Sequence, residues 1–232
     1  MVMHLSAASI VRHALRVVIL GTAIVAVVRG ETLYGLYCVL ALVVTLIPAV
    51  SARDINAGIP IELELGLLWL MFTDMTLGNS LGLYELAWFD KALHLTSSFL
   101  IALVAFLTIY VLHSSRKIAF RAWLDGIAIV LVTLGFGALW EIGEFSVDHV
   151  FGRRTQGAPA MSPLDDTMVD LVLDAVGGVL GATFGPLYMR YSPRSRTLAL
   201  ELGDLVAQRL RDTQGRSLAY GLLRQRIKKE TT

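Results

Sequence analysis

The sequence is short of charged residues and has almost no cysteine, and each shortage narrows what the protein can be. Asp, Glu, Lys and Arg make up 17% of the 232 residues, whereas a soluble domain carries about 25%. With a mean hydropathy of +0.64, this composition is typical of a membrane protein. The single cysteine, Cys38, lies in an apolar run, which excludes a disulfide framework and a cysteine-based metal motif.

Also missing are an internal repeat, a second globular region and a cleavage site after the first apolar run. Arg12 and Arg16 precede Val17–Val28 in the manner of a secretory signal peptide. The chain continues with Arg29–Glu31 and a further apolar run, without the small residues of a cleavage site. We therefore predict that this first segment is retained as a membrane span.

Long apolar segments are what the sequence has in abundance. A transmembrane helix needs about 20 mostly apolar residues. The apolar segments predict an all-α fold, a polytopic transmembrane bundle of about six helices within residues 1–191. The predicted spans are Ala14–Val28, Thr32–Val50, Ile61–Leu77, Asp90–Leu112, Leu124–Phe145 and Asp166–Tyr188.

Residues 192–232 differ from the rest because they form a basic tail. Apolar residues recur at helical spacing among its charged residues, which indicates an amphipathic helix. We expect this helix to lie on the cytoplasmic membrane surface, where basic residues favour anionic lipid. A loosely ordered tail is the alternative. The apolar positions are Leu198, Leu202, Leu205, Val206 and Leu210.

The lysines and arginines are distributed unevenly between the predicted loops. Cytoplasmic loops carry the excess of basic residues in membrane proteins. A cytoplasmic N-terminus leaves only Arg29, Lys91, Arg153 and Arg154 outside. The sequence therefore predicts a multi-pass protein of the bacterial cell (inner) membrane with both termini in the cytoplasm.

Three of the predicted spans carry acids three or four residues apart, which places them on one helix face. Ionisable groups within membrane spans are costly and mark functional sites. The alternative role is structural, as interhelical hydrogen bonds or, for Asp148 and Asp166, as solvated helix ends. The groups are Asp90 with His94, Glu141 with Glu144 and Asp148, and Asp166 with Asp170 and Asp174.

These three groups are expected to meet at one side of the membrane. The fourth span begins, the fifth ends and the sixth begins on the same side, whichever absolute orientation holds. At a rise of 1.5 Å per residue, Asp174 lies roughly 12 Å deeper than Asp166. The sequence therefore predicts one shared polar site.

So many carboxylates beside one imidazole cannot all be ionised in a low-dielectric site without a counter-charge. Either a divalent cation neutralises them, or several are protonated and form a proton or cation path. Carboxylates with a neutral imidazole favour Mn, Fe, Zn or Mg. We predict Glu144 as a general base or as a residue that orients the metal ligands. The predicted metal ligands are Asp90, His94, Glu141, Asp170 and Asp174, with Asp148, Asp166, Gln156 and Arg154 as the rim of the site.

The same residues resemble those of a known family. WFDKALH at Trp88–His94, WEIGE at Trp140–Glu144, and TQG from Thr155 followed by DTMVD from Asp166 are similar to the YjdF-like family of bacterial multispanning membrane proteins, which is remotely similar to VanZ-like proteins. The resemblance covers about residues 60–186 and implies a helical bundle with a shared polar site, but no reaction. The insertion Ala158–Leu164 departs from the pattern.

Two classes of function fit these observations. The first is a metal-dependent membrane enzyme that hydrolyses or transfers groups on a lipid or lipid-linked substrate, with Arg153 and Arg154 able to meet a phosphate. The second is a proton- or cation-coupled transporter, with a non-catalytic accessory protein as a further alternative. A transporter is expected to carry polar groups through the full membrane depth. The one-sided acids favour the enzyme, with membrane lipid and no nucleic acid as partner.

Overall fold

The computed structural model is helical throughout the part of the chain that it describes. It describes residues 7–54, 60–115, 121–156 and 161–230, with only the backbone for 47–54, 210 and 213–230, and these ranges contain no strand. The expected all-α class is therefore confirmed. The helices are α1 (Ala7–Val28), α2 (Thr32–Asp54), α3 (Ile61–Phe72), the π-helix η1 (Thr73–Ser80), the 3-10 turn η2 (Leu83–Glu85), α4 (Ala87–Ser114), α5 (Ala122–Phe151), α6 (Pro163–Tyr191) and α7 (Pro193–Glu230).

Four of these helices, α1, α4, α5 and α6, are long and apolar enough to cross a membrane. In α2 the apolar part Thr32–Leu46 is shorter. The third predicted span is not one α-helix, because α3 ends at Phe72 and η1 continues it with wider turns. The amide of Leu81 donates to Thr76 O, five residues back, at 3.0 Å, which is the bond of a π-helix.

The ends of the site-bearing helices follow local sequence signals. Ser162 Oγ accepts a hydrogen bond from Asp165 N at 3.2 Å and caps α6, whose first residue is Pro163. Gly152 ends α5 with a φ of 62°, a left-handed conformation that suits glycine. Both signals lie in the connection between α5 and α6, so they fix where the acids of these two helices stand.

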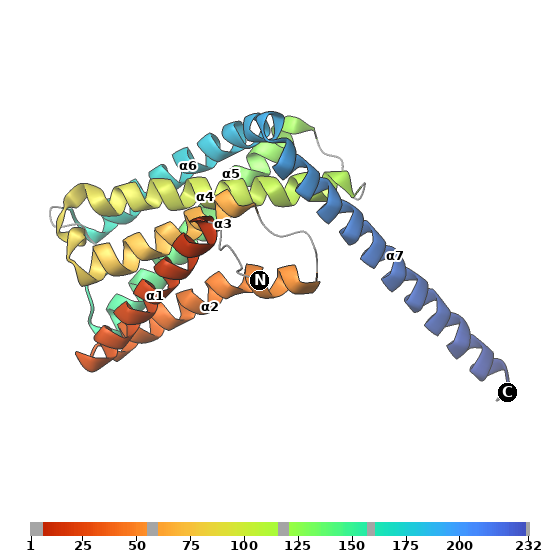
Figure 1. Ribbon diagram of the computed structural model, residues 1–232, viewed down its shortest axis with the longest axis horizontal. Helices are drawn as coiled ribbons and strands as arrows, with labels where there is room; N and C mark the ends of the chain where they lie inside the picture. The colour runs from red at the N-terminus through yellow and green to blue at the C-terminus, as the bar shows by residue number, and fades with distance from the viewer. Residues whose placement is uncertain (1–6, 55–59, 116–120, 157–160, 231–232) are drawn as a thin grey trace.

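The bundle is organised around α4, α5 and α6, which contact one another pairwise. α1, α2 and α3 form a second group that packs against this core through α3 and α4. In Figure 1 the α1–α2 turn, the start of α4 and the α5–α6 connection lie together at the left. The predicted placement of the three acid-bearing segments at one end of the bundle therefore holds.

One face of α6 carries acids in its first half and glycines in its second. A Cβ on Gly177 would lie 2.8 Å from Ser98 Cβ and 2.9 Å from Leu95 O of α4. The backbones of α4 and α6 thus approach more closely than any larger residue would allow. The buried residues of this face are Asp166, Asp170, Asp174, Gly177, Gly178, Gly181, Gly185 and Met189.

At the other end of the bundle, an ion pair joins the first helices. Arg12 Nη1 lies 3.1 Å from Glu64 Oε2, and Arg16 Nη2 lies 3.0 Å from Glu64 Oε1. Arg16 also donates to Thr45 O at 2.6 Å. Glu64 therefore links α1 to α3, and Arg16 links both to α2.

The predicted tail helix is α7, which begins directly after α6 and packs on the end of α4. A Cβ on Gly203 would lie 3.2 Å from Val111 O. Of the predicted apolar positions, Leu198, Leu202 and Val206 are half-buried and Leu205 is exposed; the Leu210 side chain lies outside the described residues. Among the described side chains of α7, the buried ones are small: Ser195, Ala199, Gly203 and Ala207.

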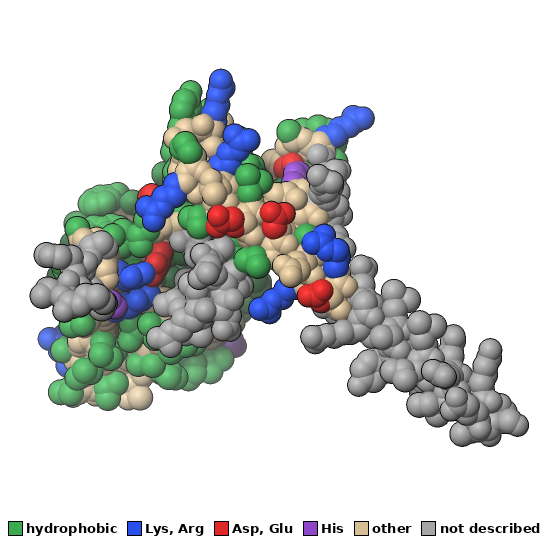
Figure 2. Space-filling view, turned by 45° about the vertical axis from the view of Figure 1, so that its right-hand side comes forward, with side chains coloured by type: hydrophobic (Ala, Val, Ile, Leu, Met, Phe, Trp, Pro, Cys, Tyr) green, Lys and Arg blue, Asp and Glu red, His purple; other side chains and the backbone are tan. Residues whose placement is uncertain are grey.

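Part of the apolar side of α7 therefore packs on the bundle and is not free for a membrane surface. The second half of α7 extends away from the bundle in Figure 1. Figure 2 shows hydrophobic side chains over the bundle, whereas many charged side chains gather near the base of α7. Val28, Leu36 and Leu139 are among the exposed hydrophobic residues, as expected for a lipid-facing surface.

Candidate functional site

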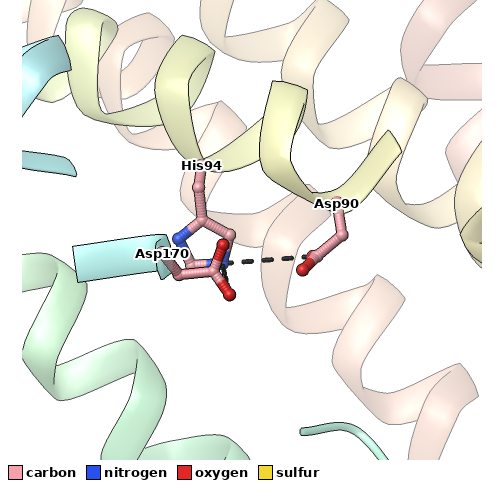
Figure 3. A group of neighbouring side chains, drawn as sticks. All are labelled: Asp90, His94 and Asp170. Atoms are coloured by element: carbon pink, nitrogen blue, oxygen red, sulfur yellow. Dashed lines mark ion pairs between the residues drawn. The ribbon is translucent and has the colours of Figure 1, made fainter. Parts of the chain in front are cut away.

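Acids from separate helices come together at one end of the α4–α5–α6 core. α4 contributes Asp90 and His94, one helical turn apart, and α6 contributes Asp170. Figure 3 shows these three side chains meeting, and one ligand atom of each lies within 4.8 Å of the others. Helical spacing thus places the first two together, and the packing of α6 on α4 adds the third.

The imidazole of His94 faces carboxylates from all three core helices. Its Nε2 lies 3.7 Å from Glu141 Oε1, 4.0 Å from Asp90 Oδ1 and 4.0 Å from Asp170 Oδ2. These distances are too long for direct hydrogen bonds. Nδ1 lies 3.3 Å from Asp174 Oδ1. The ring is therefore tethered at Nδ1, and its Nε2 points toward three carboxylates that it does not bond.

Lys91 supplies a positive charge to this cluster. Its Nζ lies 2.5 Å from Asp166 Oδ1, 2.6 Å from Asp170 Oδ2 and 3.0 Å from Asp90 Oδ2. Asp166, predicted at the rim, is buried, and its side chain is only 3% exposed. The ammonium group therefore compensates part of the negative charge that the sequence analysis assigned to a metal or to protons.

Asp174 is the deepest of the acids and is held from both neighbouring helices. Ser98 Oγ of α4 donates to its Oδ1. On the other side, α5 has Gly137, where an added Cβ would overlap Asp174 Oδ2. That oxygen is buried and accepts no hydrogen bond. The glycine thus leaves room for the carboxylate but offers it no donor.

Only one of the two carboxylate oxygens of Glu141 on α5 accepts a hydrogen bond. Thr167 Oγ1 of α6 donates to its Oε2 at 2.7 Å. Gln156 Nε2 donates to Thr167 Oγ1 at 3.0 Å and reaches Glu141 O at 3.5 Å. The other oxygen, Oε1, is buried without a hydrogen-bond partner. Gln156, predicted at the rim, therefore orients Glu141 through Thr167 and leaves Oε1 facing His94.

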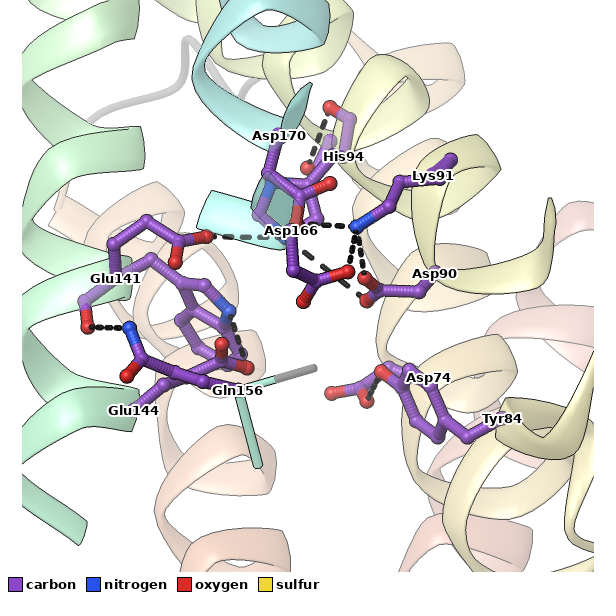
Figure 4. A network of polar contacts seen from close by, with 12 residues as sticks. Asp74, Tyr84, Asp90, Lys91, His94, Glu141, Glu144, Gln156, Asp166 and Asp170 are labelled. Atoms are coloured by element: carbon purple, nitrogen blue, oxygen red, sulfur yellow. Dashed lines mark hydrogen bonds and ion pairs between the residues drawn. The ribbon is translucent and has the colours of Figure 1, made fainter. Parts of the chain in front are cut away.

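Glu144, the predicted base, stands at the edge of the cluster. It follows Glu141 by three residues on α5, and Trp140 Nε1 donates to its Oε1 at 3.1 Å. In Figure 4 it lies beside Gln156, apart from the contacts around Lys91. Glu144 is thus placed to meet a group that approaches the cluster from outside.

Two further residues of the predicted rim hold the loop after α5 or face solvent. Asp148 Oδ1 accepts from Thr155 N and Oγ1, both at 2.7 Å, and its Oδ2 accepts from Gln156 N at 2.9 Å. Both oxygens of Asp148 are thus used, so it positions Gln156 within the loop. Arg154 is exposed, and Gly157 lies outside the described residues.

A further acid, Asp74, reaches the same end of the bundle from η1. Its Oδ1 accepts from Tyr84 OH at 2.6 Å and its Oδ2 from Tyr37 OH at 2.8 Å. Burial, together with the Asp74 carboxylate, raises the pKa of the Tyr84 phenol, so its hydroxyl keeps its proton and remains a donor. Figure 4 places Asp74 and Glu144 on opposite sides of the network.

The cluster holds more negative than positive charge. Among the described residues, Lys91 and His94 are the basic groups in ion pairs with Asp90, Glu141, Asp170 and Asp174, so even a protonated His94 leaves two of these four carboxylates without a counter-charge. Buried polar atoms without partners are rare, yet the cluster contains three: Glu141 Oε1, Asp170 Oδ1 and Asp174 Oδ2.

These donors fit a divalent cation. Carboxylate oxygens and an imidazole nitrogen suit Mn, Fe and Zn, and carboxylates suit Mg. Two atoms that each bind one ion at about 2.1 Å are at most about 4.2 Å apart. The three carboxylate oxygens around His94 Nε2, at 3.7 to 4.0 Å, are close to this limit, so they would move a few tenths of an ångström inward (~0.3–0.6 Å) to share one ion with the imidazole. Lys91 shares Asp90 and Asp170 with the candidate ligands, so an ion and the ammonium group compete for them.

Two residues that build the site have no signal in the sequence. Ser98 and Thr167 act through side-chain contacts that no local pattern shows. Lys91 had a visible signal, because it directly follows Asp90 within the WFDKALH string.

Of the comparisons with known proteins, the match to a family model identifies a membrane protein. A family model described as "Predicted membrane protein (DUF2238)" matches residues 10–191. An uncharacterized protein of Thermotoga maritima is 32% identical over 134 residues, which are 56% of this chain and 65% of that relative, slightly less than two thirds of its length. No solved structure matches. Neither match carries the YjdF-like or VanZ-like name, so those resemblances stay predictions.

Proposed function

Because the chain belongs to the DUF2238 family of predicted membrane proteins and carries a buried acidic centre, we propose that it is a metal-dependent membrane enzyme. It hydrolyses or transfers a group on a lipid or lipid-linked substrate. The observation that carries the proposal is Glu141 Oε1, a buried carboxylate oxygen without a hydrogen-bond partner that lies 3.7 Å from His94 Nε2, where oxygens of Asp90 and Asp170 also converge. Burying unpaired charge costs several kcal/mol or more, and a bound cation removes that cost.

Asp90, His94, Glu141 and Asp170 are the residues that would hold the ion, and Asp174, predicted as a ligand, would orient the His94 ring. When bound, it would supply Lewis-acid polarisation of a carbonyl or phosphoryl oxygen. Asp174 fixes the His94 ring through Nδ1, which leaves Nε2 as the ligand atom. Glu144, outside this set and held by Trp140, accepts a proton from water or from a substrate hydroxyl.

The site opens toward one end of the bundle. The side chains of Asp90 and Lys91 are 19% and 15% exposed, whereas that of Asp170 is 2% exposed. A substrate headgroup therefore enters past Asp90 and meets buried ligands behind it. With both termini in the cytoplasm of a bacterial cell, this end faces the outer leaflet.

The inner half of α6 supports a transporter less well than an enzyme. Beyond Asp174 the buried face of α6 consists of glycines and Met189. Thr133 of α5 borders Gly178 there, but its hydroxyl donates to Ile129 O of its own helix. A proton or cation pathway needs polar groups or broken helices at that depth, and the acids of α6 end at Asp174.

Metal analysis of detergent-purified protein tests the proposal. Wild type should retain or rebind close to one equivalent of Mn, Fe, Zn or Mg after chelation and dialysis. His94→Ala and Asp170→Ala should lose it, whereas Glu201→Gln, at an exposed position on α7 far from the cluster, should keep it. Absence of any divalent metal from the wild-type protein would remove the basis of the proposal, and a proteoliposome ion flux that depends on Glu144 would favour the transporter.

A further inference from the structure

Asp74 is an acid whose described partners are all neutral. Tyr84 and Tyr37 donate one hydroxyl to each carboxylate oxygen, and Asn79 Nδ2 lies 3.3 Å from Oδ1. None of the ion pairs found among the described residues includes Asp74. A buried, ionised Asp74 would therefore have no counter-charge among these partners. A cation from outside the chain would supply it.

The surroundings of Asp74 are aromatic. The ring of Tyr37 on α2 lies 6.1 Å from that of Trp140 on α5, measured between centroids. Trp140 is 43% exposed, so part of its surface is accessible to a ligand. Its indole NH holds Glu144. Tyr37 and Trp140 thus form an aromatic link between the two carboxylates that stand on opposite sides of the network.

The turn that brings Tyr84 to Asp74 is built by glycines. A Cβ on Gly78 would lie 2.5 Å from Tyr84 Cε2 and 3.0 Å from Phe89 Cε1, so only glycine lets these rings pack on η1. Gly82, with a φ of 78°, then reverses the chain. The Tyr84 ring also packs edge-on against Phe89 with centroids 5.3 Å apart. The position of the Tyr84 hydroxyl is therefore fixed before any ligand binds.

Negative charge lined by aromatic rings is the arrangement that recognises organic ammonium groups. No arginine or lysine lies over the rings of Tyr37, Tyr84 or Trp140 among the described residues, where the cation–ring contact is Arg190 on Tyr191. A second metal ion is a poorer match, because both tyrosine hydroxyls are used as donors to Asp74. A phosphate is disfavoured, since Lys91 is bound to three carboxylates.

We infer that Asp74, with the rings of Tyr37, Tyr84 and Trp140, binds the ammonium group of an amine-bearing substrate headgroup. This role rests on the proposed function. It places the amine beside the metal centre that acts on the rest of the headgroup. The bond that reacts lies on the side of Glu144 and His94, and Asp74 binds the charged end of the substrate.

Lipid-binding measurements on the full chain in neutral detergent test this role. Native mass spectrometry would compare dihexanoyl phosphatidylethanolamine, dihexanoyl phosphatidylglycerol and free ethanolamine. Wild type should bind the amine lipid about tenfold more tightly than the glycerol lipid. Asp74→Asn and Trp140→Leu should abolish this preference. The matched controls Glu85→Gln and Trp123→Leu, both at exposed positions, should keep it.

The outcomes separate this role from the proposed function. Equal binding of the two lipids by wild type, or unchanged preference in Trp140→Leu, would overturn the ammonium site while metal binding still stands. If free ethanolamine binds as tightly as the amine lipid and competes with it, the ammonium site is supported and its ligand is a soluble amine. If Asp74→Asn does not fold, Tyr37→Phe, which removes one donor and keeps the ring, should weaken the preference in its place. The metal content of Asp74→Asn should equal that of wild type. If wild type binds no metal but still prefers the amine lipid, only the proposed enzyme function is contradicted.

Discussion

The carboxylate of Asp174 on α6 occupies the place where a side chain on Gly137 of α5 would begin. An added Cβ at Gly137 would overlap Asp174 Oδ2 and lie 2.7 Å from its Cγ. From the third helix, Ser98 and His94 contact the other carboxylate oxygen. Gly137 therefore sets how far this acid reaches between the helices.

Gly137→Ala should displace the Asp174 carboxylate and with it the His94 ring. We expect metal affinity to fall about tenfold, the usual effect of disturbing the groups that orient ligands. Overpacking should also cost about 1–3 kcal/mol of stability. Gly135→Ala is the matched control, because no atom lies within 4 Å of its added Cβ. Metal titration of both variants checks this, and equal affinities would contradict it.

Lys91→Met should destabilise the metal-free protein. Removal of the ammonium leaves Asp166 and Asp170 buried without their cation, and loss of one partner of a buried ion pair costs about 3–5 kcal/mol. Excess divalent metal should restore part of this loss, because it no longer competes with the ammonium group. Unfolding in detergent with chelator and with metal measures both effects. Arg153→Met, at an exposed position, is the control, and a Lys91→Met protein as stable as this control would refute the ion-pair role.

Arg16→Met should weaken the bundle without affecting the metal centre. It removes the bond to Thr45 O and one of the two guanidinium partners of Glu64. We expect a loss of about 3 kcal/mol and unchanged metal affinity. Combined with Lys91→Met, the losses should add to within about 0.5 kcal/mol, because the two sites share no partner. Strong non-additivity in the double variant would show that the two ends are coupled.

Gly181→Leu should disrupt the contact between α4 and α6. A Cβ on Gly181 would collide with Ala102 Cβ and lie 3.1 Å from Phe99 O, so the helices must separate. Gly143→Leu gives the same chemical change at a position where nothing lies within 4 Å. Thermal unfolding of the two variants should differ by at least about 3 kcal/mol. Similar unfolding midpoints for the two variants would mean that the α4–α6 contact tolerates a side chain at position 181.

Orientation can be tested with single cysteines in a Cys38→Ala background. Glu85→Cys should react with a membrane-impermeant maleimide in intact cells, since the site end is expected outside. Arg194→Cys, at the start of α7 just beyond the opposite end of α6, should react only after the membrane is permeabilised. Both positions are exposed. The reverse pattern would invert the topology and leave the clustering of the acids unchanged.

The clustering itself follows from the sequence. Asp90 and His94 share a face because they are four residues apart, and alternation of the spans brings Asp170 to the same end. Lys91 could not be placed by this reasoning, because a residue next to Asp90 lies about 100° around the helix. It joins the cluster only because its long side chain bends back to α6.

Other features depend on contacts between distant segments. Asp148 lies on the face of Glu141 and Glu144, but Thr155 and Gln156 fold back and use both its oxygens. The predicted third span contains a π-helix, and helical periodicity carries no signal for a change in bond pattern at Thr73. The orphaned oxygens are equally invisible in a sequence, since they reflect which donors are absent in space.

The acidic face of α6 has a consequence for how the protein is made. Each aspartate at the centre of a membrane helix adds about 2.5–3.5 kcal/mol to insertion through the translocon, and α6 carries Asp166, Asp170 and Asp174 on one face. Ribosomes complete α4 before α6, so Lys91 and His94 can already stand in the bilayer when these acids arrive. We expect biogenesis to couple the two helices, with α6 entering the lipid by pairing with α4 rather than on its own hydrophobicity.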